Sequence, residues 1–179
     1  MRLHRTISPD LPLLVVALEE EATHLHISEL PVLVTGAGMR NAALAVATIL
    51  ADWSPSRVVN LGTAGALRDG VVGTNVIRSV SPHDPDAEPI QLGGSGLRLT
   101  SGDMFVRDES TRALLAQHAD LVDMEGYAVA RASLDAGIPV TLVKQVSDSA
   151  GAGAGRSWLN SVDECAEALG AWAREHLLG

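Results

Sequence analysis

The stretch that decides the fold reads Leu121-Val122-Asp123-Met124-Glu125-Gly126-Tyr127-Ala128-Val129-Ala130. A short apolar run, residues 119–122, precedes Met-Glu-Gly, and a run rich in small residues then continues to Ala136. This order predicts a strand that leads into a helix. Glu125 stands at the junction, near the carboxyl end of the strand, which is where ligands bind in open α/β sheets.

Two further acidic residues follow apolar runs in the same way. Asp148 comes shortly after residues 140–146 and precedes a glycine-rich stretch, and Glu21 ends a run of three glutamates after residues 13–18. Three carboxylates at strand ends, brought to one edge of one sheet, would form a site for acid–base chemistry. Each also has a simpler interpretation: a turn cap for Asp148, a favourable first helical turn for Glu125, and a solvated helix start for Glu21.

Length and composition indicate one α/β domain over residues 1–179. Hydrophobic residues make up 46% of the chain but aromatic residues only 3%, so the core must be built from Ala, Val and Leu. Such a core suits helices packed closely on a buried sheet. Alternating strand and helix patterns favour a sheet covered by helices.

Charge and cysteine usage exclude several classes of protein. A net charge of −9 argues against nucleic acid and anionic membranes as partners. The single cysteine, Cys165, excludes an internal disulfide and fits a reducing compartment. No apolar run reaches the ~18 residues of a membrane span, and the first residues lack the apolar core of a signal peptide. We therefore expect a cytoplasmic protein.

The remaining elements follow from periodicity and breakers. The expected strands are residues 11–18, 31–35, 57–61, 74–80, 97–101, 119–122 and 140–146. The expected helices are residues 19–25, 40–52, 108–118, 128–136 and 161–178, the last opened by a Ser161-x-x-Glu164 capping box and buried along Cys165, Leu169, Trp172 and His176. Residues 81–96 are expected to form a loop, and residues 151–155 a lid or linker.

Common cofactor and metal motifs are incomplete or missing. Gly36-x-Gly38 has half of a dinucleotide fingerprint, but Asn41 stands where the third glycine belongs, so nicotinamide and flavin are not expected. Backbone N–H groups at such a helix start still suit an anion or a polarised water. None of the six histidines has the spacing of a metal site.

Six motifs, taken in order, resemble those of the nucleoside phosphorylase/nucleosidase superfamily, and most closely those of the 5'-methylthioadenosine/S-adenosylhomocysteine nucleosidases. The motifs are Val16-Ala17-Leu18-Glu19-Glu20-Glu21, Thr35-Gly36-Ala37-Gly38, Asn60-Leu61-Gly62-Thr63-Ala64-Gly65, Thr100-Ser101-Gly102-Asp103-Met104-Phe105, Val122-Asp123-Met124-Glu125 and Val146-Ser147-Asp148. The resemblance implies an α/β fold, a three-layer α/β/α sandwich with a mixed central sheet. It also implies a homodimer that needs neither a metal nor an organic cofactor.

The same resemblance implies catalytic roles. Asp148, supported by Ser147, matches the aspartate that protonates the leaving purine. Glu21 matches the glutamate that activates the attacking water, and Thr63 falls where a hydroxyl residue helps to position that water. The implied reaction is hydrolysis of the N-ribosidic bond of methylthioadenosine or adenosylhomocysteine, which releases adenine and a thioribose.

Substrate-binding roles are implied for four more residues. Glu125 matches the glutamate that binds the ribose hydroxyls, and Met124 falls where a methionine packs on the sugar. Phe105 falls where an aromatic ring stacks on the base, and the Val106 backbone where the base edge is read. For the residue that caps the purine from the C-terminal segment, both Trp158 and Val162 remain candidates.

Departures from the family pattern keep alternatives open. Phosphorylases of the superfamily carry an arginine at the position of Asn60. Asn60 lacks that positive charge, and Glu21 would repel phosphate, so water is favoured over phosphate as the nucleophile here. Lys144 stands where the family usually has an arginine, and the loop from His83 to Gly94 is shorter than usual. Hydrolysis of another purine nucleoside such as a futalosine-like compound, phosphorolysis, and nucleoside binding without turnover are therefore the alternatives.

Overall fold

The structure is a computed structural model that describes residues 1–25, 29–84, 86–150 and 154–178, with the backbone alone for residues 154–160. Its strands are β1 (Arg2–His4), β2 (Leu13–Val16), β3 (Val32–Val34), β4 (Val58–Ala66), β5 (Thr74–Pro82), β6 (Ile90–Gln91), β7 (Leu97–Ser101), β8 (Leu121–Asp123) and β9 (Val140–Asp148). Its helices are α1 (Glu19–Ala22), α2 (Met39–Asp52), α3 (Glu109–Leu115), α4 (Gly126–Asp135) and α5 (Ala154–Leu177).

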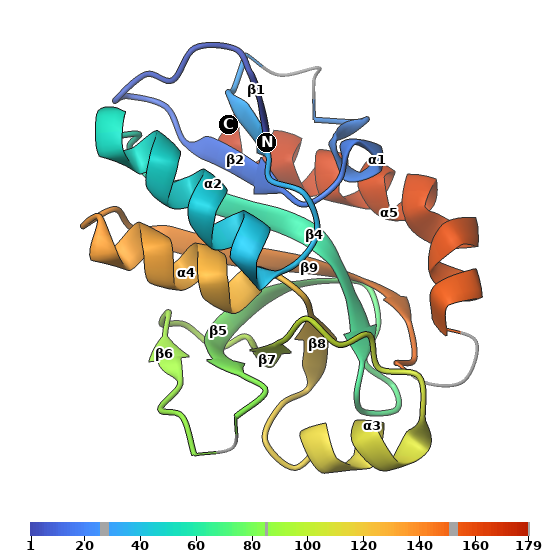
Figure 1. Cartoon of the computed structure of the whole chain (residues 1–179). Helices are drawn as coiled ribbons and strands as arrows, with labels where there is room; N and C mark the ends of the chain where they lie inside the picture. Colours follow the sequence, from blue (N-terminus) through green and yellow to red (C-terminus); the bar gives the residue numbers. More distant parts are fainter. Residues whose placement is uncertain (26–28, 85, 151–153, 179) are drawn as a thin grey trace.

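All of these strands belong to one mixed sheet, in the order β1-β3-β2-β4-β8-β7-β5-β6, with β9 paired to both β4 and β5 (Figure 1). Strands β2, β3, β4 and β9 run in one direction, whereas β8 is antiparallel to β4, and β5 to β9. The double pairing of β9 closes β4, β8, β7, β5 and β9 into a ring. The predicted mixed α/β fold with a central sheet is confirmed.

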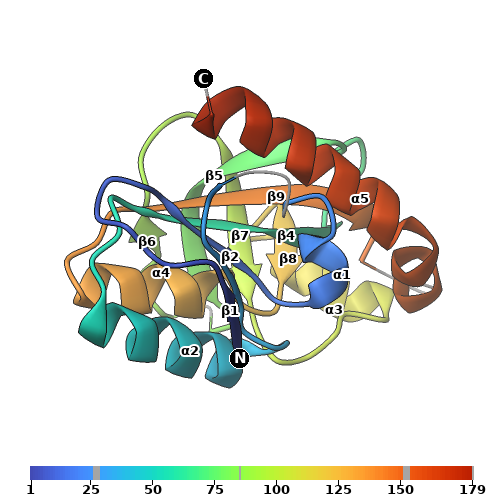
Figure 2. The same ribbon diagram turned by 90° about the horizontal axis from the view of Figure 1, so that it is seen from above.

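Helices cover both faces of the sheet, α2 and α4 on one face and α1 and α5 on the other (Figure 2). Alternate residues of β2 pack toward the two sides, because side chains along a strand point to opposite faces. Leu13 and Val15 join the core beneath α2 and α4, whereas Leu14 and Val16 join the core beneath α1 and α5. Burial of both faces explains the continuous apolar run.

Two strands were not predicted. Residues 81–96 were expected to form a loop, but β5 extends to Pro82, and β6 pairs with it through Ile90 opposite Val80. The two residues of β6 are too few to show an alternation of apolar and polar residues. The strand forms only because it pairs with β5. Strand β1 was also missed, because it is short, half-exposed and stabilised by antiparallel pairing with β3.

The predicted start of the last helix was wrong. Helix α5 begins at Ala154, so Ser161 lies inside the helix, where its hydroxyl donates to the Ser147 carbonyl at 3.4 Å instead of capping a terminus. The proposed lid falls on residues 151–153, which lie outside the described residues, and on two residues that are helical. Of the predicted stripe, Cys165 and Leu169 are buried, but Trp172 is only half-buried and His176 is exposed. No helix in the described part of the chain is both long enough and apolar enough to cross a membrane.

Candidate active site

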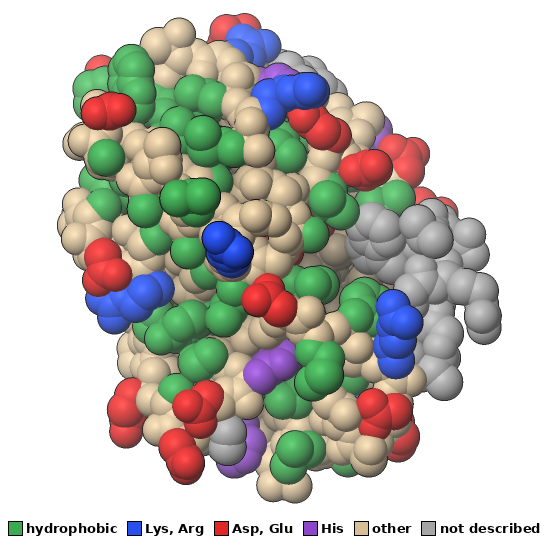
Figure 3. Space-filling view, in the orientation of Figure 1, with side chains coloured by type: hydrophobic (Ala, Val, Ile, Leu, Met, Phe, Trp, Pro, Cys, Tyr) green, Lys and Arg blue, Asp and Glu red, His purple; other side chains and the backbone are tan. Residues whose placement is uncertain are grey.

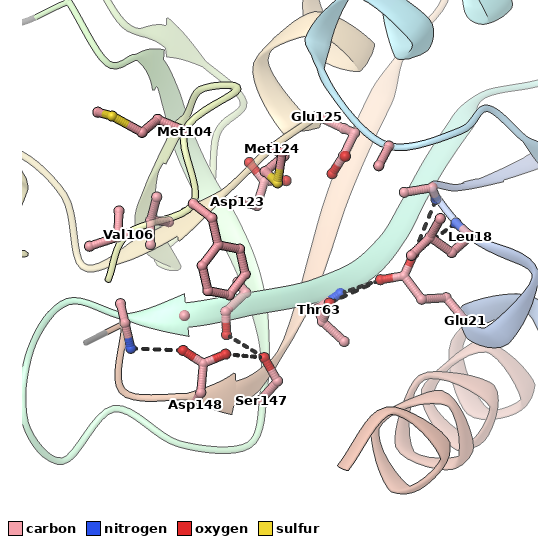
Figure 4. Close-up of a pocket in the computed structure, with 17 residues that line it drawn as sticks. Leu18, Glu21, Thr63, Met104, Val106, Asp123, Met124, Glu125, Ser147 and Asp148 are labelled. Atoms are coloured by element: carbon pink, nitrogen blue, oxygen red, sulfur yellow. Dashed lines mark hydrogen bonds between the residues drawn. The ribbon is translucent and has the colours of Figure 1, made fainter. Parts of the chain in front are cut away.

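A cavity of about 220 Å³ opens between the ends of β2, β4 and β9, the β8–α4 junction and the segment after β7. Glu21, Glu125 and Asp148 enter it from three sides (Figure 4). The eight residues that were assigned a catalytic or substrate-binding role all line this cavity: Glu21, Thr63, Phe105, Val106, Met124, Glu125, Ser147 and Asp148. Residues far apart in the sequence therefore surround a single space.

Glu21 is held in place by four hydrogen bonds. Its Oε2 accepts from the backbone N–H groups of Ala17 and Leu18, just before α1, at 3.1 and 3.2 Å. Its Oε1 accepts from the backbone N–H and the hydroxyl of Thr63 on β4 at 2.9 and 3.0 Å. Glu21 is only 3% exposed, so one buried carboxylate links α1 to β4.

Asp148 owes its position to an irregularity at the end of β9. Ala64 pairs with Val146 but Gly65 pairs with Asp148, so Ser147 is an extra residue in β9, as in a β-bulge. The bulge brings Ser147 and Asp148 together at the cavity. Asp148 then accepts from the Ser147 hydroxyl through Oδ2 and from the Ala150 N–H through Oδ1, both at 2.8 Å.

Glu125 precedes the first turn of α4, and its Oε1 accepts from the Gly38 N–H at 2.7 Å. Burial, with the negative charges of Asp123 and Glu21, raises the pKa of Glu125 to about 7. The Gly38 hydrogen bond and the positive charge of Lys144 oppose this increase. The carboxyl group is therefore poised between its two protonation states near neutral pH.

A buried ion pair at the wall of the cavity was not predicted: Asp123 lines the cavity, and Lys144 does not. Lys144 Nζ is 2.8 Å from Asp123 Oδ2, and the two side chains are only 2% and 1% exposed. Lys144 also donates to Asn60 Oδ1 at 2.7 Å. The sequence did contain a signal, because a lysine within the apolar run of β9 requires a buried partner. An added Cβ at Gly62 would lie 3.3 Å from Lys144 Nζ and 3.4 Å from Glu21 Oε1, so this glycine leaves room for both groups.

The opposite wall is apolar. Met104, Phe105 and Val106 come from the segment between β7 and α3, and Val106 is buried whereas Phe105 is 36% exposed. The Arg107 guanidinium lies 5.5 Å from the centre of the Phe105 ring. Of the two candidates for capping a purine, Val162 does not line the cavity, and the side chain of Trp158 lies outside the described residues.

One of the three carboxylates follows a strand that runs in the opposite direction to the others. Glu21 and Asp148 follow β2 and β9, which both run parallel to β4, but β8 is antiparallel to β4. Strand β8 pairs with β4 through Val122 opposite Gly65 and Leu121 opposite Ala66, so Asp123, its last residue, lies near the carboxyl end of β4. Glu125 therefore reaches the cavity although its strand runs against β4.

Comparison with known proteins supports the fold. A family model described as "Phosphorylase superfamily" matches residues 97–177. The 5'-methylthioadenosine/S-adenosylhomocysteine nucleosidase of Treponema pallidum (strain Nichols) is 26% identical in a match that covers 65% of this chain and 65% of that protein. The corresponding nucleosidase of Exiguobacterium sp. (strain ATCC BAA-1283 / AT1b) is 27% identical in a match that covers 66% of this chain and 67% of that protein. The chain thus spans about two thirds of the length of these relatives.

Solved structures with the same fold include two enzymes of Helicobacter pylori. A mutant of its methylthioadenosine/adenosylhomocysteine nucleosidase, with 5'-methylthioadenosine in the active site, superposes with a TM-score of 0.84 at 19% identity and covers 93% of this chain and 97% of that chain. Its futalosine hydrolase superposes with a TM-score of 0.84 at 18% identity, covering 93% and 96%.

The matches in sequence and fold confirm the resemblance to the phosphorylase superfamily that the six motifs indicated. The chain is also similar to the methylthioadenosine/adenosylhomocysteine nucleosidases, the name that both curated relatives carry. Among the residues described by the structure, no group of three or more His, Cys, Asp or Glu side chains is arranged to hold a metal ion.

Proposed function

We propose that this protein is a purine nucleoside N-ribosyl hydrolase that cleaves 5'-methylthioadenosine or S-adenosylhomocysteine to adenine and a thioribose. The observation that carries the proposal is the convergence of Glu21, Glu125 and Asp148 on one cavity with an apolar wall. The names of both curated relatives support the choice of substrate.

Asp148 is the general acid of the proposed mechanism. Cleavage of the N-ribosidic bond leaves negative charge on the purine, and a proton delivered to N7 neutralises it. Hydrogen bonds from Ser147 and Ala150 orient the Asp148 carboxyl group. A positioned acid of this kind contributes ~10²–10⁴ in rate.

Glu125 binds the ribose hydroxyls, and its ionised form stabilises the positive charge that develops on the sugar ring, as in glycoside hydrolysis. Met124, which lines the same cavity, packs on the sugar. Phe105 stacks on the base and the Val106 backbone reads the base edge, since an aromatic ring in an apolar wall suits the face of a flat base.

Glu21 takes the proton of the attacking water, and Thr63 positions that water. Thr63 already donates two hydrogen bonds to Glu21 Oε1, so base and positioning residue form one unit. Proton removal by the carboxylate increases the nucleophilicity of the water at the moment of attack.

Charge around the cavity favours water over phosphate as the nucleophile. The cavity is lined by Glu21, Asp123, Glu125 and Asp148, and no lysine or arginine lines it among the described residues. This arrangement repels a phosphate anion. Asn60 is committed elsewhere, because its amide group binds Lys144 and the Val15 carbonyl.

Chromatographic detection of adenine tests the proposal directly. The protein should release adenine from methylthioadenosine without phosphate, and Asp148→Asn should lower kcat by ~10²–10⁴. Asp86→Asn, at an exposed aspartate before β6, should leave the rate unchanged. Release of no adenine would remove these substrates from consideration.

A substrate panel separates the alternatives. Cleavage of a futalosine-like nucleoside alone would identify the second hydrolase activity, for which the similarity to futalosine hydrolase is the supporting observation. Formation of a ribose 1-phosphate would indicate phosphorolysis. Tight adenine binding without turnover would indicate a nucleoside-binding protein.

We further propose that residues 1–179 form one nucleosidase-like domain, an α/β/α three-layer sandwich that acts in the cytoplasm as a homodimer. The single cysteine and the net charge of −9 support the compartment. Hydrophobic side chains that gather over α2 and α4 support the dimer (Figure 3). Among them, Leu44 on α2 is 67% exposed and Leu134 on α4 is 40% exposed.

A further inference from the structure

Two carboxylates from different parts of the chain bind the start of α2. The Gly38 N–H donates to Glu125 Oε1 at 2.7 Å, and the next N–H, that of Met39, donates to Asp103 Oδ1 at 2.6 Å. The first N–H groups of a helix lack partners within the helix, and the helix dipole favours anions there. Glu125 lines the cavity, whereas Asp103 lies outside it.

Asp103 belongs to residues 102–108, which join β7 to α3 and carry the apolar wall of the cavity. The beginning of this segment is held by the Gly102 N–H, which donates to the Asp123 carbonyl at 3.1 Å. Its end is held by Asp108, which caps α3 by accepting from the Thr111 N–H at 2.9 Å. Between these two ends, Asp103 ties the segment across to α2.

The backbone around this tie is adapted to it. Gly38 has φ +96°, a conformation that residues with a side chain rarely adopt. An added Cβ there would lie 3.0 Å from Asp103 Oδ1. At Gly102, an added Cβ would collide with the ring of His83, so the backbone just before Asp103 is also fixed by close packing.

We propose that Asp103 is a positioning residue that sets the distance between the Phe105 ring and Glu125. The inference rests on the proposed function, in which this ring stacks on the base and Glu125 binds the sugar of the same nucleoside. Because adjacent N–H groups of α2 hold Glu125 and Asp103, the two halves of the binding site share one anchor. Loss of the tie frees the base wall, whereas Asp148 and Glu21 keep all of their hydrogen bonds.

Phe105 is the only phenylalanine in the chain, so incorporation of fluorophenylalanine places a single fluorine probe on the segment. In Asp103→Ala the fluorine NMR signal should shift and broaden, and KM for methylthioadenosine should rise about tenfold, the loss expected for a charge-assisted hydrogen bond. The value of kcat should change much less. Asp103→Asn retains an oxygen that can accept from Met39, so its signal and KM should stay closer to those of the wild type.

Asp86→Ala is the matched control, because it removes an exposed aspartate that is not bound to α2, and it should change neither the signal nor KM. An Asp103→Ala protein with the wild-type signal and KM would overturn the proposal. A lowered unfolding midpoint with unchanged signal and KM would also overturn it, since Asp103 would then be merely structural. The fluorine signal tests the tie even if no nucleoside is cleaved, so failure of the proposed function remains distinguishable.

Discussion

In the folded protein the carboxyl group of Glu125 stays protonated to a higher pH than an ordinary glutamate. Burial and the nearby charge of Asp123 raise the pKa of Glu125 from 4.5 to about 7. Between these two values the folded state retains a proton that the unfolded state has already lost, so this group makes the protein less stable as the pH rises. At low pH the protonated carboxyl group of Glu125 adds about 3 kcal/mol to the free energy of unfolding, at 1.36 kcal/mol for each pH unit between the two pKa values. This stabilisation is lost as the pH rises through 7.

Substitution Glu125→Gln should therefore remove this pH dependence. The glutamine oxygen can still accept from the Gly38 N–H, but the side chain never ionises. We expect the variant to be about 3 kcal/mol more stable than the wild type at about pH 8, with little difference near pH 4.5. Urea unfolding at the two pH values measures the change. A parallel decrease in stability for both proteins over this range would assign the pH dependence to other groups.

At the scale of elements, the site depends on how closely α5 packs on the turn that follows α1. An added Cβ at Gly170 of α5 would lie 2.8 Å from both Cβ and the carbonyl oxygen of His24. Helix α1, just before this turn, carries Glu21. Gly170, which does not line the cavity, can therefore influence the position of the carboxylate proposed to activate the water.

Gly170→Ala should destabilise the protein even though alanine is the better helix former. The gain in helix propensity is about 1 kcal/mol, whereas overpacking costs about 1–3 kcal/mol. We expect a net loss of about 1 kcal/mol in urea unfolding and a lower kcat/KM, because α1 must shift. Ala171→Gly, at an exposed site in α5, should lose about 1 kcal/mol by propensity alone and keep its activity. Equal activity of the two variants would contradict this coupling.

At the scale of the whole molecule, hydrophobic side chains gather on the surface over α2 and α4 (Figure 3). Exposed apolar patches of this kind mark interaction sites. The wild-type protein should therefore sediment at twice its chain mass of 18.7 kDa. Leu44→Asp should shift it toward the monomer, whereas Leu114→Asp, at a residue 60% exposed on α3, should not. A monomeric wild type would contradict the proposed dimer.

Much of this architecture could be predicted because it depends on local patterns. The apolar run of β2 indicated a strand buried on both faces, and the segments after β2, β8 and β9 indicated where acidic residues stand relative to strand ends. The predicted element boundaries were less accurate where pairing with a distant strand decides them, as at β6, or where a local signal was misleading, as at Ser161. The capping box failed because helix propagation continued through it from Ala154.

The sequence by itself determined which acidic residues follow strands and which runs form most of the strands, since both depend on side-chain type and short-range periodicity. Only the tertiary structure decided that β8 runs against β4, that Lys144 pairs with Asp123, and that Asp103 binds the start of α2. These relations join segments separated by tens of residues. No local pattern specifies them, because strand direction and long-range pairing arise from packing of the whole sheet.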